Sequence, residues 1–165
     1  MASAQYNIND IIARGMPDAT GMRVGIVVSE WNDSITLALT DGAAKTLKQY
    51  GVKEEDILIK TVPGSFELIY GSSLMAQSHE VDAVIAIGCI IRGETPHFDF
   101  IAQGTTNGLA ALNAQGEVPV IFGVLTCSNR QQAEERSGGV LGNKGEEYGA
   151  TAIKMIAYRR SLEKK

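Results

Sequence analysis

The stretch AIGCIIRGETPHFDF, from Ala86 to Phe100, changes character partway along. Its first six residues are small or apolar, as in a buried strand, and its last residues read as the start of a helix. Between them lie an arginine, a glycine, a glutamate, a threonine, a proline and one of only two histidines in the chain. Polar residues gathered where a core strand ends indicate a binding site at that end of the strand.

The alternation of strand and helix continues on both sides of this stretch. Apolar runs of strand length span residues 23–29, 56–64, 82–91 and 118–127. Helical patterns span residues 31–51, 65–79, 97–116, 129–138 and 143–165, the third of them weakened by internal glycines. Near-continuous apolar strands are typical of a parallel sheet covered on both faces. The sequence therefore predicts an α/β protein, a flavodoxin-like three-layer αβα sandwich with a four-stranded parallel sheet doubly wound by helices.

Length and composition limit the classes of protein that fit. The 165 residues suit one domain over 22–165, preceded by a lead-in segment over 1–21 that shows no clear period. The net charge of −4 argues against a nucleic-acid partner, and no apolar run is long enough to span a membrane. Cys89 and Cys127 are far apart, fit no zinc motif and are expected to be reduced core thiols. With no signal peptide pattern, a cytoplasmic protein without a metal or cofactor is expected.

Ligands of open parallel sheets bind beyond the carboxyl ends of the strands. All four predicted strand ends carry unusual residues: SEWND, VPGSFE, GCIIRGETPH and TCSNRQQAEER. Trp31, the only tryptophan, is either a partly buried packing residue or a platform on which a flat heterocycle stacks. Asn32 is one of three candidate N-caps of the next helix. Glu67 either offsets a helix dipole or binds the hydroxyl groups of a ligand.

The third strand end has the densest set of polar groups. Gly93, Glu94 and Thr95 can present backbone N–H groups to a phosphate. Pro96 restrains the backbone before His97, and the positive end of a helix favours a neutral imidazole there, which can accept a proton. His79 is interpreted as a solvated loop residue.

Four further charged residues stand out. Arg92 and Asp99 are candidates for an ion pair. Arg136 alone is typical of a helix surface. Lys144 lies between glycines at a helix start, where a cation opposes the dipole, so we expect a nearby anion.

The segments WND, VPGSFE, AIGCIIRGETPHFDFIA, PVIFGVLT, QAEERSG and GNKG resemble the lumazine synthase family, in its order and spacing. The resemblance covers residues 22–160. It implies condensation of 5-amino-6-(D-ribitylamino)uracil with 3,4-dihydroxy-2-butanone 4-phosphate. The products are 6,7-dimethyl-8-ribityllumazine, phosphate and water, in the penultimate step of riboflavin biosynthesis.

The resemblance also implies roles for particular residues. His97 transfers protons. The pyrimidinedione and ribityl contacts fall on Trp31, Ser65, Phe66, Glu67, Cys89, Ile90, Ile91 and Phe122. Phosphate contacts fall on Glu94, through its backbone N–H, and on Thr95 and Arg136. Secondary candidates are Asn32, Gly93 and Lys144.

The resemblance further implies a homopentamer or a multiple of it, up to a sixty-subunit shell, with active sites between subunits. Phe122, Arg136 and Lys144 then come from the neighbouring subunit. Riboflavin synthase is the partner enzyme that the resemblance suggests. Two alternatives stay open from the sequence: an archaeal-type riboflavin synthase and a non-catalytic flavin- or lumazine-binding module.

Overall fold

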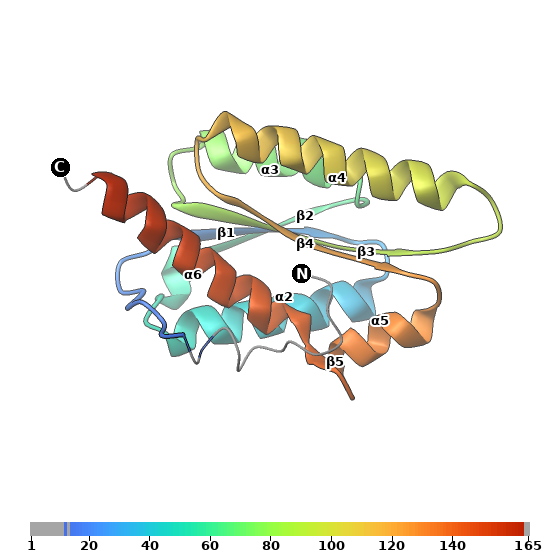
Figure 1. The fold of residues 1–165 in the computed structure, drawn as a ribbon, viewed down its shortest axis with the longest axis horizontal. Helices are drawn as coiled ribbons and strands as arrows, with labels where there is room; N and C mark the ends of the chain where they lie inside the picture. The colour runs from blue at the N-terminus through green and yellow to red at the C-terminus, as the bar shows by residue number, and fades with distance from the viewer. Residues whose placement is uncertain (1–11, 13, 164–165) are drawn as a thin grey trace.

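The structure is a computed structural model that describes Ile12 and residues 14–163. A sheet lies between two layers of helices (Figure 1). This arrangement confirms the predicted three-layer αβα sandwich. Most of the predicted lead-in, residues 1–11 and 13, lies outside the described residues.

The sheet has four parallel strands in the order β2-β1-β3-β4. The strands are β1 (Val24–Ser29), β2 (Ile57–Val62), β3 (Ala83–Ile91) and β4 (Val120–Cys127). Because all four run in the same direction, their carboxyl ends lie along one edge of the sheet. The chain reverses its direction of winding between β1 and β3, which is where such sheets bind ligands.

Helices cover both faces of the sheet (Figure 1). One face carries α2 (Asp33–Gln49), α5 (Arg130–Arg136) and α6 (Lys144–Glu163). The other carries α3 (Leu68–Gln77) and α4 (His97–Gln115). A short 3-10 helix, η1 (Glu54–Asp56), precedes β2. Each helical layer buries its own apolar cluster against the sheet, as two-sided burial of the strands requires.

Glycines allow neighbouring helices to approach closely. A Cβ atom at Gly149 of α6 would lie 2.7 Å from the carbonyl oxygen of Ala43 on α2. On the other face, a Cβ atom at Gly108 of α4 would overlap the side chain of Ile69 on α3. Helix α4 is continuous over 19 residues although we expected its glycines to weaken it. Those glycines mark the surface on which α3 packs.

Two features differ from the sequence prediction. Helix α3 begins at Leu68, so residues 65–67 form a turn rather than the first turn of the helix. A short antiparallel hairpin of β5 (Ser137–Gly139) and β6 (Gly142–Asn143) separates α5 from α6 and was not predicted. Among the described residues, no helix combines the length and the apolar character needed to cross a membrane.

Candidate active site

Hydrogen bonds hold the loops after β1, β2 and β3 side by side. The backbone N–H of Glu30 donates to the carbonyl of Val62 at 2.9 Å, and that of Trp31 donates to Pro63 at 3.3 Å. The side-chain amide of Asn32 donates to the carbonyl oxygen of Cys89 at 2.8 Å. Three strand ends that are distant in sequence therefore form one continuous surface.

Asn32 is the N-cap residue of α2, as predicted, but it does not act as a capping side chain. Its backbone is left-handed, with φ 62° and ψ 45°, a conformation that asparagine tolerates better than most residues. Its amide is used for the bond to Cys89. The tight turn and this bond together set the direction in which the neighbouring Trp31 projects.

Trp31 is 74% exposed, so its interpretation as a partly buried packing residue is wrong for this chain. The backbone of Trp31 lies beside the end of β2, because its N–H is bonded to Pro63. An exposed aromatic face at this edge is available to stack on a planar ring. Stacking a base on an aromatic side chain contributes roughly 1–3 kcal/mol.

The turn after β2 places three predicted residues in different environments. Ser65 is buried beneath β3, since a Cβ atom at Gly88 would lie 2.8 Å from its Oγ. The half-exposed ring of Phe66 packs against Gly104 of α4. Glu67 is exposed and its Oε2 bends back over Gly64. Within the described residues its carboxylate has no hydrogen bond or ion pair, which leaves it free to accept from ligand hydroxyl groups.

The end of β3 offers a ligand mainly its backbone. Cys89 and Ile90 are buried, and Ile91 is partly buried. Burial raises the pKa of the Cys89 thiol to about 12, with a further contribution from the neighbouring Cys127. The thiol is therefore neutral at physiological pH and unsuited to nucleophilic attack.

The loop from Gly93 to His97 is exposed throughout. The backbone N–H groups of Gly93, Glu94 and Thr95 have no acceptor within the part of the chain that the structure describes. His97 is the first residue of α4, and its N–H makes a long 3.4 Å contact with Oγ1 of Thr95. Free N–H donors before the positive end of a long helix favour an anion such as phosphate.

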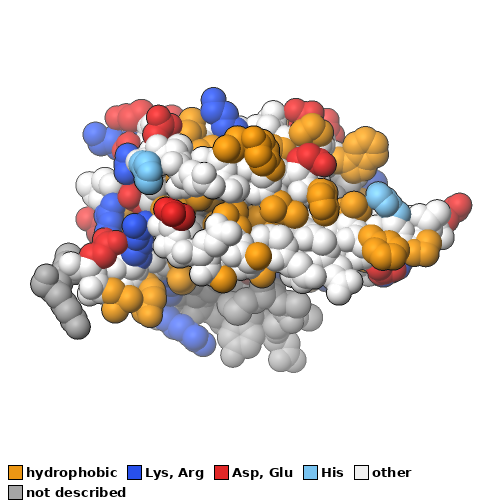
Figure 2. All heavy atoms as spheres, turned by 90° about the horizontal axis from the view of Figure 1, so that it is seen from above, with side chains coloured by type: hydrophobic (Ala, Val, Ile, Leu, Met, Phe, Trp, Pro, Cys, Tyr) orange, Lys and Arg blue, Asp and Glu red, His pale blue; other side chains and the backbone are white. Residues whose placement is uncertain are grey.

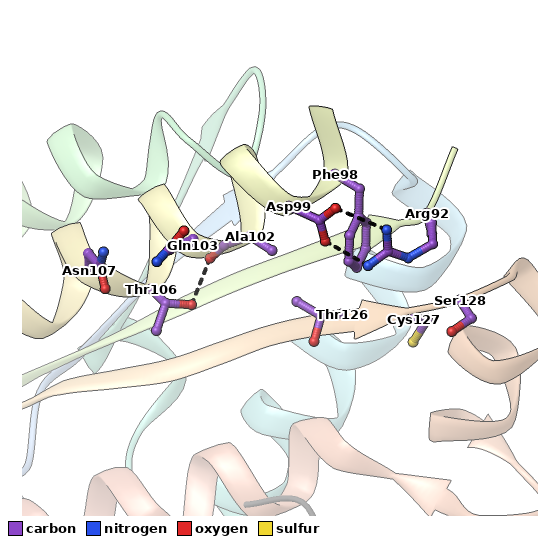
Figure 3. Close-up of a pocket in the computed structure, with 10 residues that line it drawn as sticks. All are labelled: Arg92, Phe98, Asp99, Ala102, Gln103, Thr106, Asn107, Thr126, Cys127 and Ser128. Carbon is purple, nitrogen blue, oxygen red and sulfur yellow. Dashed lines mark hydrogen bonds and ion pairs between the residues drawn. The ribbon is translucent and has the colours of Figure 1, made fainter. Parts of the chain in front are cut away.

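Arg92 and Asp99 form the predicted ion pair. Two guanidinium nitrogens donate to the two carboxylate oxygens at 2.6 and 3.1 Å. The guanidinium also lies 4.1 Å from the centre of the Phe98 ring. Both side chains line an open groove of about 570 Å³ between α4 and the end of β4 (Figure 3).

Three predicted site residues lie elsewhere on the chain. Phe122 is 41% exposed in the middle of the edge strand β4, where it pairs with Ala86. Arg136 is at the end of α5, and it donates to the carbonyl of Gln132 at 2.9 Å. Lys144 begins α6. Both helices cover the face of the sheet opposite α4 (Figure 1). No hydrogen bond or ion pair in the described part of the chain joins these three residues to the strand-end loops.

Lys144 has the anion that its position required. Its Nζ lies 2.6 Å from Oε1 of Glu147, and both side chains are largely buried. Glu147 was not predicted as this partner, although a spacing of three residues on a helix indicates such a pair. Arg136 has a weaker neighbour, with 3.8 Å between its Nη1 and Oε2 of Glu135. Among the described residues, no cluster of three His, Cys, Asp or Glu side chains is arranged to hold a metal ion.

The fold and these contacts define an α/β protein with a ligand site at the carboxyl ends of its strands. The sequence model of the 6,7-dimethyl-8-ribityllumazine synthase family matches residues 21–160. A protein of that name from Phocaeicola vulgatus is 56% identical over 164 residues, which is 99% of this chain and 98% of the relative. Another from Bacteroides fragilis is 59% identical over 87% of this chain and all of the relative. A third, from Porphyromonas gingivalis, is 52% identical over 97% of this chain and 99% of its own length.

The chain belongs to the 6,7-dimethyl-8-ribityllumazine synthase family, which is a family of enzymes.

Proposed function

We propose that the chain condenses 5-amino-6-(D-ribitylamino)uracil with 3,4-dihydroxy-2-butanone 4-phosphate to give 6,7-dimethyl-8-ribityllumazine, phosphate and water. Family membership supports this reaction. The site assignment depends on the hydrogen bonds that hold the loops after β1, β2 and β3 together. An exposed indole, a carboxylate and three N–H donors, the latter two without a partner among the described residues, occupy the carboxyl end of the sheet.

Each of these groups suits one part of the two substrates. The indole of Trp31 stacks on the pyrimidinedione, and the backbone at the end of β3 borders that ring. The carboxylate of Glu67 accepts hydrogen bonds from ribityl hydroxyls. The N–H groups of Gly93, Glu94 and Thr95 hold the phosphate. The exposed carboxylate of Glu94 must then point away from that anion, since like charges repel.

The chemistry needs orientation and proton transfer. An amine of the pyrimidine attacks the ketone and water leaves to give an imine, phosphate is then eliminated, and the second amine closes the ring with loss of a second water. Holding two reactants in contact lowers the entropic part of the barrier. His97, at the start of α4 between the phosphate loop and the ring site, moves protons between the amines and the leaving oxygens.

The active site is completed by a second copy of the chain in a homopentamer or a multiple of it. Phe122, Arg136 and Lys144 of the neighbouring subunit supply the missing contacts, with Arg136 directed at the phosphate. Exposed apolar side chains support self-association, because patches of this kind mark interaction surfaces. Four of them, Phe66, Tyr70, Leu74 and Phe100, lie on α3, on α4 or in the turn before α3, on the face shown in Figure 2. The two free buried thiols fit a reducing cytoplasm.

The test is to mix the purified protein with both substrates and to follow lumazine fluorescence together with phosphate release. We expect one phosphate for each lumazine. His97→Ala should lower kcat about 100-fold, because general acid–base catalysis contributes roughly 10²–10⁴-fold, and should leave the KM values nearly unchanged. Consumption of lumazine without phosphate release would indicate a riboflavin synthase. Lumazine binding without turnover would indicate a binding module.

A further inference from the structure

The Arg92–Asp99 ion pair joins the two ends of the loop that carries the free N–H donors. Arg92 follows β3, and its backbone N–H donates to the carbonyl of Cys127 at 2.9 Å. Asp99 lies in the first turn of α4. The two-pronged contact between their side chains therefore closes the intervening residues into a ring, with the Phe98 side chain against the guanidinium (Figure 3).

We propose that Arg92 and Asp99 are positioning residues that hold the loop of residues 93–97 in the shape that binds the phosphate group of the substrate. The inference rests on the proposed function, because it deepens the role of the same loop. The pair itself does not contact the substrate. It acts through the backbone N–H groups of Gly93, Glu94 and Thr95.

The loop has few other restraints. Within the described residues its hydrogen bonds are the long contact from His97 to Thr95 and the bonds that Asp99 and Phe100 donate to the carbonyl of Pro96. The N–H groups that face a ligand are bonded to nothing in the described chain. Their relative directions thus depend on the distance between Arg92 and the first turn of α4, which the ion pair sets.

The ion pair is poorly placed to stabilise the fold. Its side chains are 46% and 59% exposed, and pairs this exposed contribute little to stability. A planar guanidinium that bonds a carboxylate through two parallel contacts instead defines a geometry, which a lysine ammonium cannot do. Pairing also screens the charge of Asp99, which would otherwise lie close to the bound phosphate.

The experiment compares Arg92→Ala, Asp99→Ala, the double variant and Arg92→Lys with the parent enzyme. In each, both KM values, kcat, the melting temperature and the dissociation constant for inorganic phosphate are measured. We expect each alanine variant to raise the KM of the phosphate-bearing substrate and the Kd of inorganic phosphate roughly tenfold, since small misplacements of binding groups are costly. The KM of the pyrimidine substrate should change less than about twofold, because that substrate does not use the loop.

The remaining variants separate geometry from charge. The double variant should bind phosphate no more weakly than either single variant, because each single substitution already removes the same ion pair. For Arg92→Lys, the KM of the phosphate-bearing substrate and the Kd of inorganic phosphate should stay close to the values of Arg92→Ala. Lysine keeps the positive charge but cannot make the two parallel hydrogen bonds to the carboxylate. Arg159→Ala is the matched control: it breaks an ion pair with Glu163 of similar exposure at the far end of α6 and should change none of these quantities.

Three outcomes would overturn the proposal. The first is a lower melting temperature with unchanged phosphate affinity. The second is an equal rise in both KM values. The third is full rescue by lysine, which would leave charge alone as the cause. If the parent enzyme made no lumazine, the proposed function would fail, whereas the inorganic phosphate titration would still decide whether the ion pair shapes an anion site.

Discussion

At the scale of single residues, the site depends on side chains that hold backbone in place. Asn32 occupies a left-handed conformation and bonds Cys89, so that Trp31 is presented outward. Asn32 was expected as a helix cap because its residue type and position fit one. Its bond to a carbonyl 57 residues away could not be predicted, since no local pattern records which strand end lies beside it.

The residues with local signals were the easier ones to recognise. Trp31 is unique in the chain, and Gly93 to His97 follow a strand within a few residues. The ion pair between Arg92 and Asp99 could also be predicted, because the two residues flank one short loop. Glu147 was overlooked as the partner of Lys144, although both lie on the first turn of α6. The interactions that link different strand ends required the structure.

The pH dependence of stability gives a test at Cys89. Burial raises the pKa of this thiol from an ordinary value of 9.0 to about 12. Above pH 9 the unfolded chain loses the proton while the folded chain keeps it, so this group lowers the free energy of unfolding as pH rises towards 12. In denaturant titrations at pH 7.5 and about pH 10.5, Cys89→Ala should therefore lose less stability between the two conditions than the parent. The difference in the free energy of unfolding between the two proteins at pH 7.5 measures the packing that the substitution removes, and it is subtracted from the difference at about pH 10.5. An equal alkaline loss in both proteins would contradict this account.

At the scale of secondary structure, the pattern of apolar residues predicted the four strands and the helices around them. The elements that escaped prediction are those without a period. The β5–β6 hairpin has strands of three and two residues, and two of its strand residues, Gly138 and Gly142, have positive φ angles of 121° and 77°. Nothing in so short a segment distinguishes paired strands from a loop. The start of α3 was placed three residues early, because the polar turn of Ser65 to Glu67 has a composition that a helix also accepts.

The glycines of helix α6 provide a test of how the elements pack. Gly149→Ala should destabilise the protein by about 1–2 kcal/mol, because overpacking costs roughly 1–3 kcal/mol and the better helix propensity of alanine returns up to about 1 kcal/mol. The added Cβ would lie 2.7 Å from the carbonyl of Ala43 and 3.1 Å from Cβ of Thr46. Denaturant unfolding measures the loss.

Gly93→Ala is the matched control for this substitution. A Cβ atom at Gly93 would have no neighbour within 4 Å, and no left-handed φ is required there. We therefore expect its free energy of unfolding to stay within about 0.5 kcal/mol of the parent. If Gly149→Ala were as stable as Gly93→Ala, the close approach of α2 and α6 would not need glycine.

At the scale of the whole molecule, the proposed substrate groups of one chain do not all lie at its strand ends. Ser65 to Glu67 follow β2, whereas Phe122 lies on β4, at the other edge. Phe122 pairs with Ala86, two residues before the Gly88 against which Ser65 packs, so Phe122 lies partway along the sheet rather than at the strand ends. Arg136 ends α5 and Lys144 begins α6, and both helices cover the face away from α4 (Figure 1). We propose that a complete site with these residues needs a second subunit.

Complementation between inactive variants tests this sharing of sites. His97→Ala disables the strand-end part of a site, and Arg136→Ala disables the part proposed to come from the neighbour. In a co-refolded equal mixture, a site works when one subunit supplies His97 and its neighbour supplies Arg136, so random assembly should restore about a quarter of the parent activity. Glu67→Ala mixed with His97→Ala is the control. Both of those residues belong to the same part of a site, so every site lacks one of them and no recovery is expected. Recovery in neither mixture, with mixed oligomers demonstrated by native mass spectrometry, would place Arg136 in the same subunit's site as His97, because no mixed oligomer would then contain an intact site.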